Sequence, residues 1–186
     1  MFIGIDLGTS SVKSILVDAN DRVIATASAP LEVSRPLPTF SEQNPEDWWN
    51  AAIATLDQLK EAAPKEMAAV TGIGLSGQQH GATLLDKDGK VLRPCILWND
   101  GRSEVECQEI AARFPEISKL TGNPAMPGFT APKLLWVRRH EPDIFAKVAT
   151  VLLPKAYLRY RLTGEMVEEM SDASGTLWLD VGKRDW

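Results

Sequence analysis

The sequence predicts a mixed α/β domain whose sheet contains both antiparallel and parallel strand pairs. Three features support this prediction: three short apolar runs separated by turn residues open the chain, a helix with a clear start follows them, and the pattern is mostly helical after Gly101. Strands that precede and then alternate with helices are typical of sheets covered by helices. A chain of 186 residues forms one or at most two domains and can bury a real core.

The first three strands are predicted at residues 2–6, 12–17 and 23–27. Turn-forming residues at 8–10 and 18–22 separate these strands. A helix over residues 45–63 follows, because residues 44–47 read Asn-Pro-Glu-Asp. This stretch supplies a cap, a proline at the first helical position and two acids in the first turn.

A further strand is predicted at 70–76, followed by a hairpin with arms at 82–85 and 91–97 around an Asp-Gly turn. Helices are predicted near residues 102–114, 131–140 and 155–162, with Gly164 as the stop of the last one. Residues 166–181 are predicted to be extended. The chain stops at Trp186 without a polar tail, so we expect the natural protein to continue.

Composition narrows the classes of protein to consider. The net charge of −5 argues against nucleic acid as the main partner. The two cysteines, Cys95 and Cys107, form no CxxC pair and no zinc spacing, so we expect reduced thiols. No signal peptide opens the chain, and no apolar run approaches the ~18 residues that a spanning helix needs. We therefore expect a cytoplasmic protein without a membrane partner.

The first candidate site is the turn after the first strand, within IDLGTSSVK at residues 5–13. Backbone N–H groups and hydroxyls in such a turn can form a nest for an anion, and a carboxylate just before it can hold hydrated Mg²⁺ through water. The candidate residues are Asp6, Gly8, Thr9, Ser10 and Lys13. A hairpin whose polar turn only faces water fits the spacing as well. The motif is not a Walker loop, because no GxxxxGK[ST] occurs.

The second candidate site follows the strand at 70–76. Residues 72–77 match GxGxxG, but they resemble a strand that leads into a hairpin rather than the start of a helix, which argues against a dinucleotide site. The polar residues Gln78, Gln79 and His80 come at the end of this strand, where α/β sheets bind ligands. Amides and a neutral imidazole suit a polyhydroxylated ligand. For His80, a purely structural role stays open.

The third candidate site is Leu-Trp-Asn-Asp-Gly-Arg at residues 97–102. Trp98 offers an apolar wall for the C–H face of a sugar, and Asn99 and Asp100 offer hydrogen-bonding groups. Asn99 or Asp100 could equally cap the next helix. For Lys133 and Trp136, which share a helical face, the pattern favours packing.

Together these stretches resemble known families. Residues 5–13 resemble the first phosphate motif of actin, Hsp70 and the sugar kinases, whose ribonuclease-H-like domain begins with three antiparallel strands and a helix. The whole chain resembles the N-terminal domain of the FGGY carbohydrate kinases, and residues 128–140 are similar to that family's first signature. The segments GQQHGATLLD, RPCILWNDGR, MPGFTAPKLLWV, LLPKAYLRYRLTGE and SDASGTLWLDV look most like the xylulokinases.

The resemblance implies a ribonuclease-H-like domain with a mixed sheet and a mostly helical C-terminal insertion, in which residues 1–186 form the sugar-binding half. It implies transfer of the γ-phosphate of ATP to D-xylulose, with Mg²⁺ as cofactor, in an enzyme that is a homodimer at full length. Asp6 would hold Mg²⁺ through water, and Thr9, Ser10 and Lys13 would contact phosphate. The implied sugar contacts are Gln79, His80 and Asp100, with Trp98 and Asn99 close by.

Two departures from the family pattern matter. Gln79 stands where many xylulokinases have Met, which puts the sugar preference in question. The second domain, with the aspartate that would deprotonate the sugar hydroxyl, is absent, so we expect no catalytic residue in this chain and no kinase activity from it alone. Rival interpretations are a kinase for another sugar or glycerol, an actin- or Hsp70-like ATPase, and a sugar-binding module.

Overall fold

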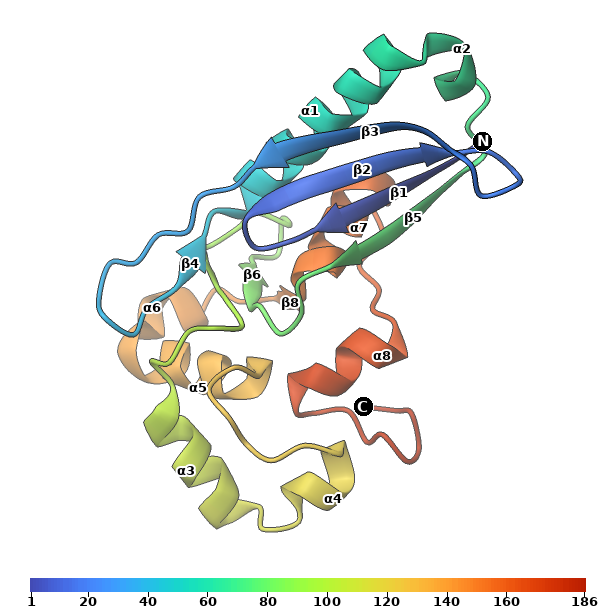
Figure 1. Ribbon diagram of the computed structural model, residues 1–186. Coiled ribbons are helices and arrows are strands. Elements are labelled where there is room, and N and C mark those ends of the chain that lie inside the picture. The colour runs from blue at the N-terminus through green and yellow to red at the C-terminus, as the bar shows by residue number, and fades with distance from the viewer.

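The computed structural model describes all residues from 1 to 186, and its centre is a four-stranded mixed sheet (Figure 1). Its strands are β1 (Phe2–Leu7), β2 (Ser11–Val17), β3 (Val23–Pro30) and β5 (Gly72–Gly77), in the order β3-β2-β1-β5. The first three pair antiparallel, whereas β5 runs parallel to β1. The predicted mixed sheet is therefore confirmed. Because β1 and β5 are parallel and in register, the turn after β1 and the residues after β5 meet at one edge.

One face of the sheet is covered by helices α1 (Pro45–Ala62) and α7 (Pro154–Thr163) (Figure 1). Strand β1 buries Ile3, Ile5 and Leu7 on this side, as its alternating pattern predicts. Helix α1 starts as predicted, with the Asn44 side chain accepting the N–H of Glu46. The aromatic rings of Trp48 and Tyr157 join the two helices edge to face.

Beside this sheet lie four short strands in two pairs. Strand β4 (Glu42–Gln43) pairs with β7 (Cys95–Ile96), and β6 (Thr83–Leu85) pairs with β8 (Thr150–Leu152), both antiparallel. The predicted hairpin is therefore only partly correct, because its arms meet at the isolated bridges Leu85–Val91 and Ala82–Ile96. Pro94 lacks the N–H that a continuous ladder needs, and each arm finds a distant partner instead.

The rest of the chain is mostly helical. Helices α3 (Glu104–Arg113), α5 (Thr130–His140) and α7 match the three predicted ones, and Gly164 ends α7 in the left-handed conformation, as expected. Whether this part is an insertion stays a prediction. None of the helices combines the length and the apolar character needed to cross a membrane.

Several short helices were not predicted: α2 (Pro64–Met67), α4 (Ile117–Thr121), α6 (Pro142–Phe145), α8 (Met170–Ala173) and the 3₁₀ helix η1 (Ser174–Thr176). The expected extended segment over 166–181 is wrong where α8 and η1 lie. Helix α8 begins at Glu169, whose carboxylate accepts the N–H groups of Ser171 and Asp172. Glutamate is not a usual cap residue, so the start of this helix cannot be predicted from the capping pattern.

Candidate functional site

The turn between β1 and β2 has the geometry of a small anion nest. The Gly8 N–H donates to the Ser11 carbonyl oxygen at 3.0 Å, which closes the turn tightly. The N–H groups of Thr9 and Ser10 donate to no acceptor within the chain, so both remain available to a ligand. Asp6 and Lys13 are exposed and lie opposite each other on β1 and β2.

The Thr9 hydroxyl joins all three predicted clusters. It donates to the Gln78 side-chain oxygen at 3.2 Å and accepts the Trp98 indole N–H at 3.0 Å. The residues come from the turn after β1, the segment after β5 and the segment after β7. The structure thus places the predicted phosphate turn directly beside the two predicted sugar segments.

Gln43, on β4, hydrogen-bonds to both Thr9 and Gln78 and is not predicted as a site residue from the sequence. Its amide nitrogen donates to the Thr9 carbonyl oxygen at 2.8 Å, and its oxygen accepts from the side chains of Gln78 and Trp48 at 3.0 Å each. Gln43 is 3% exposed, so these bonds are shielded from water. No sequence signal marks it, because β4 contains two residues only.

The segment after β5 turns sharply at His80. Gln79 is exposed, while His80 is half-buried and has φ 64°, a left-handed conformation that is uncommon outside glycine. Burial and the nearby charge of Lys133 lower the pKa of His80, and the backbone of Gly175 acts in the opposite direction. The imidazole is therefore neutral at pH 7 and can both donate and accept.

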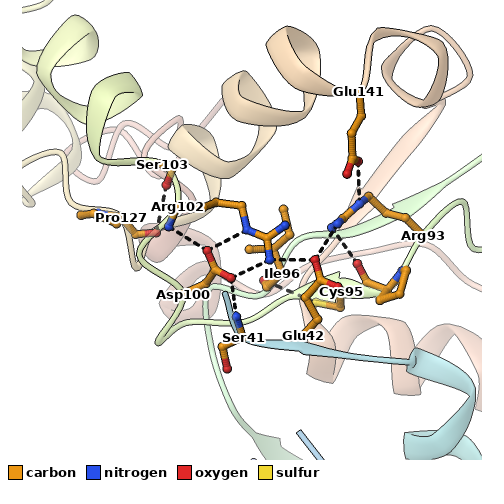
Figure 2. A network of polar contacts seen from close by, with 11 residues as sticks. Ser41, Glu42, Arg93, Cys95, Ile96, Asp100, Arg102, Ser103, Pro127 and Glu141 are labelled. Carbon is orange, nitrogen blue, oxygen red and sulfur yellow. Dashed lines mark hydrogen bonds and ion pairs between the residues drawn. The ribbon is translucent and has the colours of Figure 1, made fainter. Parts of the chain in front are cut away.

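The segment after β7 divides into an exposed part and a buried part. Trp98 is 48% exposed and Asn99 is also exposed, so both can meet a ligand. Asp100 is 2% exposed, and its carboxylate accepts from the Ser41 N–H at 2.6 Å and from the backbone and guanidinium of Arg102 (Figure 2). The sequence leaves a ligand role or a helix cap open for Asp100; α3 has Ser103 at its cap position, and the Asp100 carboxylate bonds instead to Ser41 and Arg102.

Asp100 belongs to a buried ion network that also contains Glu42, Arg93 and Arg102 (Figure 2). The guanidinium of Arg102 lies 2.7 Å from Asp100 and 2.7 Å from Glu42. Arg93 contacts the same oxygen of Glu42 and also Glu141, at 2.7 Å each. The network thereby ties β4, the loop before β7 and the end of α5 to the ligand-facing segment.

Aromatic rings complete the surroundings of Arg102. The guanidinium carbon lies 3.6 Å from the centre of the Phe40 ring and 4.8 Å from that of Trp136. Trp136 therefore has a packing role, as the sequence favours: it lies against the apolar cluster around Leu84 and Val137, and its ring also contacts the Arg102 cation.

The chain holds no group of three or more His, Cys, Asp or Glu residues that could bind a metal directly. Cys95 and Cys107 are free and buried, and burial raises the pKa of each thiol to about 12. Asp6 is left as the candidate for holding Mg²⁺ through water, because it is exposed at the edge of the turn.

The site is separate from an apolar hollow of about 540 Å³ beside β8, which is lined by residues such as Val151, Trp178 and Trp186. None of the candidate site residues lines this hollow. The predicted clusters around Thr9, His80 and Trp98 therefore lie outside this hollow.

Comparison with known proteins shows which family the chain resembles. The family model described as "FGGY family of carbohydrate kinases, N-terminal domain" matches residues 1–186. The chain is 56% identical over 186 residues to a xylulose kinase of Escherichia coli, covering 100% of this chain and 38% of that protein. A crystal structure of a xyloylose kinase from Brucella ovis superposes with a TM-score of 0.97 at 55% identity over 99% of this chain and 38% of that one.

A gluconate kinase from Lactobacillus acidophilus shares the fold more distantly, with a TM-score of 0.91 at 26% identity, over 100% of this chain and 37% of that one. The chain thus spans less than two fifths of the length of each of these three relatives.

Proposed function

The chain belongs to the FGGY family of carbohydrate kinases, and we propose that it forms the sugar-binding half of an enzyme that phosphorylates D-xylulose with MgATP. One observation supports the proposal: the Thr9 hydroxyl, in the turn proposed to bind phosphate, hydrogen-bonds to Gln78 and Trp98, which belong to the two segments proposed to bind sugar. Phosphoryl transfer needs such positioning of phosphate against hydroxyl more than it needs covalent chemistry by the protein.

The phosphate side of the proposed site is the turn after β1. The free N–H groups of Thr9 and Ser10 would bind phosphate oxygens, and Lys13 would add a positive charge. Asp6 would hold Mg²⁺ through water, and this ion would neutralise part of the phosphate charge. The residues fit this role because Asp6, Ser10 and Lys13 are exposed, and because the N–H groups of Thr9 and Ser10 are unpaired within the chain.

The sugar side is the surface formed by Gln79, His80, Trp98 and Asn99. The neutral imidazole and the two amides would exchange hydrogen bonds with hydroxyls, while the indole would cover C–H groups. Asp100 acts behind this surface, where it fixes the segment that carries Trp98 and Asn99. The base that removes the hydroxyl proton would come from a second domain, so this chain alone binds sugar without turning it over.

Calorimetric titration of the 186-residue chain with D-xylulose, D-ribulose and glycerol tests the proposal. We expect saturable heat with D-xylulose and a loss of affinity of at least 10-fold in His80→Ala. His140→Ala is the matched control, because His140 is exposed and distant in sequence from the site. No binding by a folded chain, or equal binding by His80→Ala, would reject a sugar site in this half.

A second assay on the longer protein that carries this chain addresses catalysis. We expect ADP formation that depends on D-xylulose in the longer protein and none in the 186-residue chain. The alternative substrate is another sugar or sugar acid, and it is favoured by one observation: the exposed amide of Gln79 stands in the proposed sugar surface. A higher kcat/KM for D-ribulose, gluconate or glycerol than for D-xylulose would select this alternative.

A further inference from the structure

Lys133 on α5 is a fully buried lysine that forms no ion pair. Its side chain has 0% exposed surface, and its ammonium donates to three backbone carbonyl oxygens. These belong to Phe129 at 2.9 Å, to His80 at 3.2 Å and to Gly128. An ammonium has three N–H donors, so the three carbonyls satisfy it completely. Burying such a group is costly, which makes a purely packing role a poor explanation for it.

The carbonyl of His80 receives a second hydrogen bond at the same point. The Thr130 hydroxyl, at the start of α5, donates to it at 3.1 Å. His80 has φ 64°, and a non-glycine residue keeps this conformation only where its surroundings enforce it. Thr130 and Lys133, both on α5, stabilise this conformation because both donate to the carbonyl oxygen of His80.

The imidazole of His80 is fixed from the other side by Gly175, in η1. A methyl group added at Gly175 would lie 2.1 Å from the Nδ1 atom of His80, so the ring occupies the space that a side chain would need. The ring of Phe129 packs against the imidazole edge to face, with 4.8 Å between ring centres. His80 therefore has both its backbone and its ring held by residues that come 48 or more positions later in the chain.

The same contacts reach the Trp98 segment. The carbonyl of Gly128 accepts from Lys133, and a methyl group added at Gly128 would lie 2.8 Å from the Trp98 carbonyl oxygen. The loop at residues 128–129 thus packs against Trp98 while Lys133 ties it to His80. One buried ammonium links the two segments that carry the proposed sugar contacts.

We propose that Lys133 is a positioning residue of the sugar site: its ammonium joins the His80 carbonyl to the loop at 128–129 and so sets where the imidazole stands relative to Trp98. Gly175 completes this arrangement by leaving room for the ring. The inference rests on the proposed function of His80 as a sugar contact. Lys133 itself is buried and touches no substrate.

The first test compares Lys133→Met with Lys147→Met, since Lys147 is an exposed lysine without ion pairs. The chain has two histidines, so an NMR titration of the 186-residue chain reports His80 and uses His140 as an internal reference. Burial lowers the pKa of Lys133 to about 7, so the ammonium carries charge through most of the range in which His80 titrates. We expect Lys133→Met to raise the pKa of His80 and to leave that of His140 unchanged.

The second readout is affinity for D-xylulose. We expect Lys133→Met to weaken binding at least 10-fold and Lys147→Met to leave it unchanged. A folded Lys133→Met chain with the wild-type pKa of His80 and wild-type affinity overturns the proposal. If the wild-type chain binds no sugar, the proposed function fails. The chemical shifts of the His80 ring protons in the same NMR spectra, taken where His80 is neutral, then decide whether Lys133 positions the ring, and unchanged shifts in Lys133→Met overturn the proposal.

Gly175→Ala keeps the proposal testable should Lys133→Met fail to fold. This variant leaves the carbonyl bonds of Lys133 in place and forces only the ring of His80 to move. The matched control is Gly74→Ala, because the nearest atom to a methyl group at Gly74 lies 4.0 Å away. We expect at least a 10-fold loss of D-xylulose affinity in Gly175→Ala alone. Unchanged affinity and an unchanged pKa of His80 in this variant would contradict the inference.

Discussion

Replacing Asp100 by asparagine tests whether the buried ion network is needed for folding. The carboxylate accepts four hydrogen bonds, from the Ser41 N–H at 2.6 Å and from the Arg102 N–H, Nε and terminal nitrogen at 2.9, 2.9 and 2.7 Å. Asparagine keeps the shape but replaces one acceptor oxygen by an NH₂ group. That group would face N–H donors, and Arg102 would retain Glu42 as its only carboxylate partner.

The size of the effect follows from these contacts. Each hydrogen bond to a charged group contributes about 1.5–3 kcal/mol, but the four share one carboxylate and do not add. Breaking a buried ion pair on one side costs about 3–5 kcal/mol. We therefore expect Asp100→Asn to lower the free energy of unfolding by about 3–5 kcal/mol, which corresponds to a fall in Tm of roughly 6–20 °C for a chain of this length.

Urea unfolding followed by circular dichroism measures this change, with Asp88→Asn as the matched control. Asp88 pairs with Lys87 at 3.0 Å, and both side chains are largely exposed. The same substitution there should change the stability by less than about 1 kcal/mol. A loss below about 1 kcal/mol in Asp100→Asn would show that the network contributes little. Equal losses at both positions would refute the reasoning from burial.

Three further predictions concern other buried polar groups. Burial raises the pKa of Glu168 to about 7, so between pH 4.5 and 7 the folded state binds more protons and stability falls as pH rises. Glu168→Gln should remove this slope and gain about 1–2 kcal/mol at pH 8 in urea unfolding, less than the whole shift would give because solvent screens this partly exposed carboxyl, whereas parallel pH curves would contradict it. Gln43→Leu leaves the Thr9 carbonyl and the side-chain donors of Trp48 and Gln78 unpaired, so it should lower the free energy of unfolding by about 2–4 kcal/mol in the same assay. An unchanged urea midpoint would contradict this prediction. The thiols of Cys95 and Cys107, with pKa values raised to about 12, should react with Ellman's reagent at pH 8 only after unfolding, and fast reaction of the native chain would show that they are accessible.

The parts of the fold that the sequence predicted are those with local signals. Alternating apolar residues mark β1 and β2, and the stretch that begins at Asn44 marks the start of α1, which ends one residue before its predicted end. Strands β4 and β8 carry no such signal. They contain two and three residues, and each is stabilised by a partner more than 50 positions away. Pairing over such distances cannot be inferred from periodicity.

The same limit applies to the candidate site. The three polar clusters were recognised because unusual residues follow strands, and the Thr9 hydroxyl does join them. For Lys133 the sequence predicts a packing role. A position on a helical face does not reveal that the ammonium reaches backbone carbonyl oxygens. Asp100 could be a ligand or a cap from the sequence alone. Only the location of Ser41 and Arg102 shows that its acceptors are used within the chain.

Each ligand-facing segment of the site has one buried polar group behind it. Gln43 donates to the Thr9 carbonyl, Arg102 donates to the carboxylate of Asp100 in the Trp98 segment, and Lys133 donates to the His80 carbonyl. Buried polar groups of this kind are often no more stabilising than apolar residues of the same size, so stability alone does not explain three of them. They do fix loop backbones in defined places. Phosphoryl transfer depends on such positioning, because misplacing a reacting group by about 1 Å can cost roughly 100-fold in rate. We therefore expect substitutions at these three residues to weaken ligand binding by more than their effect on stability explains, even though none of the three side chains faces the ligand.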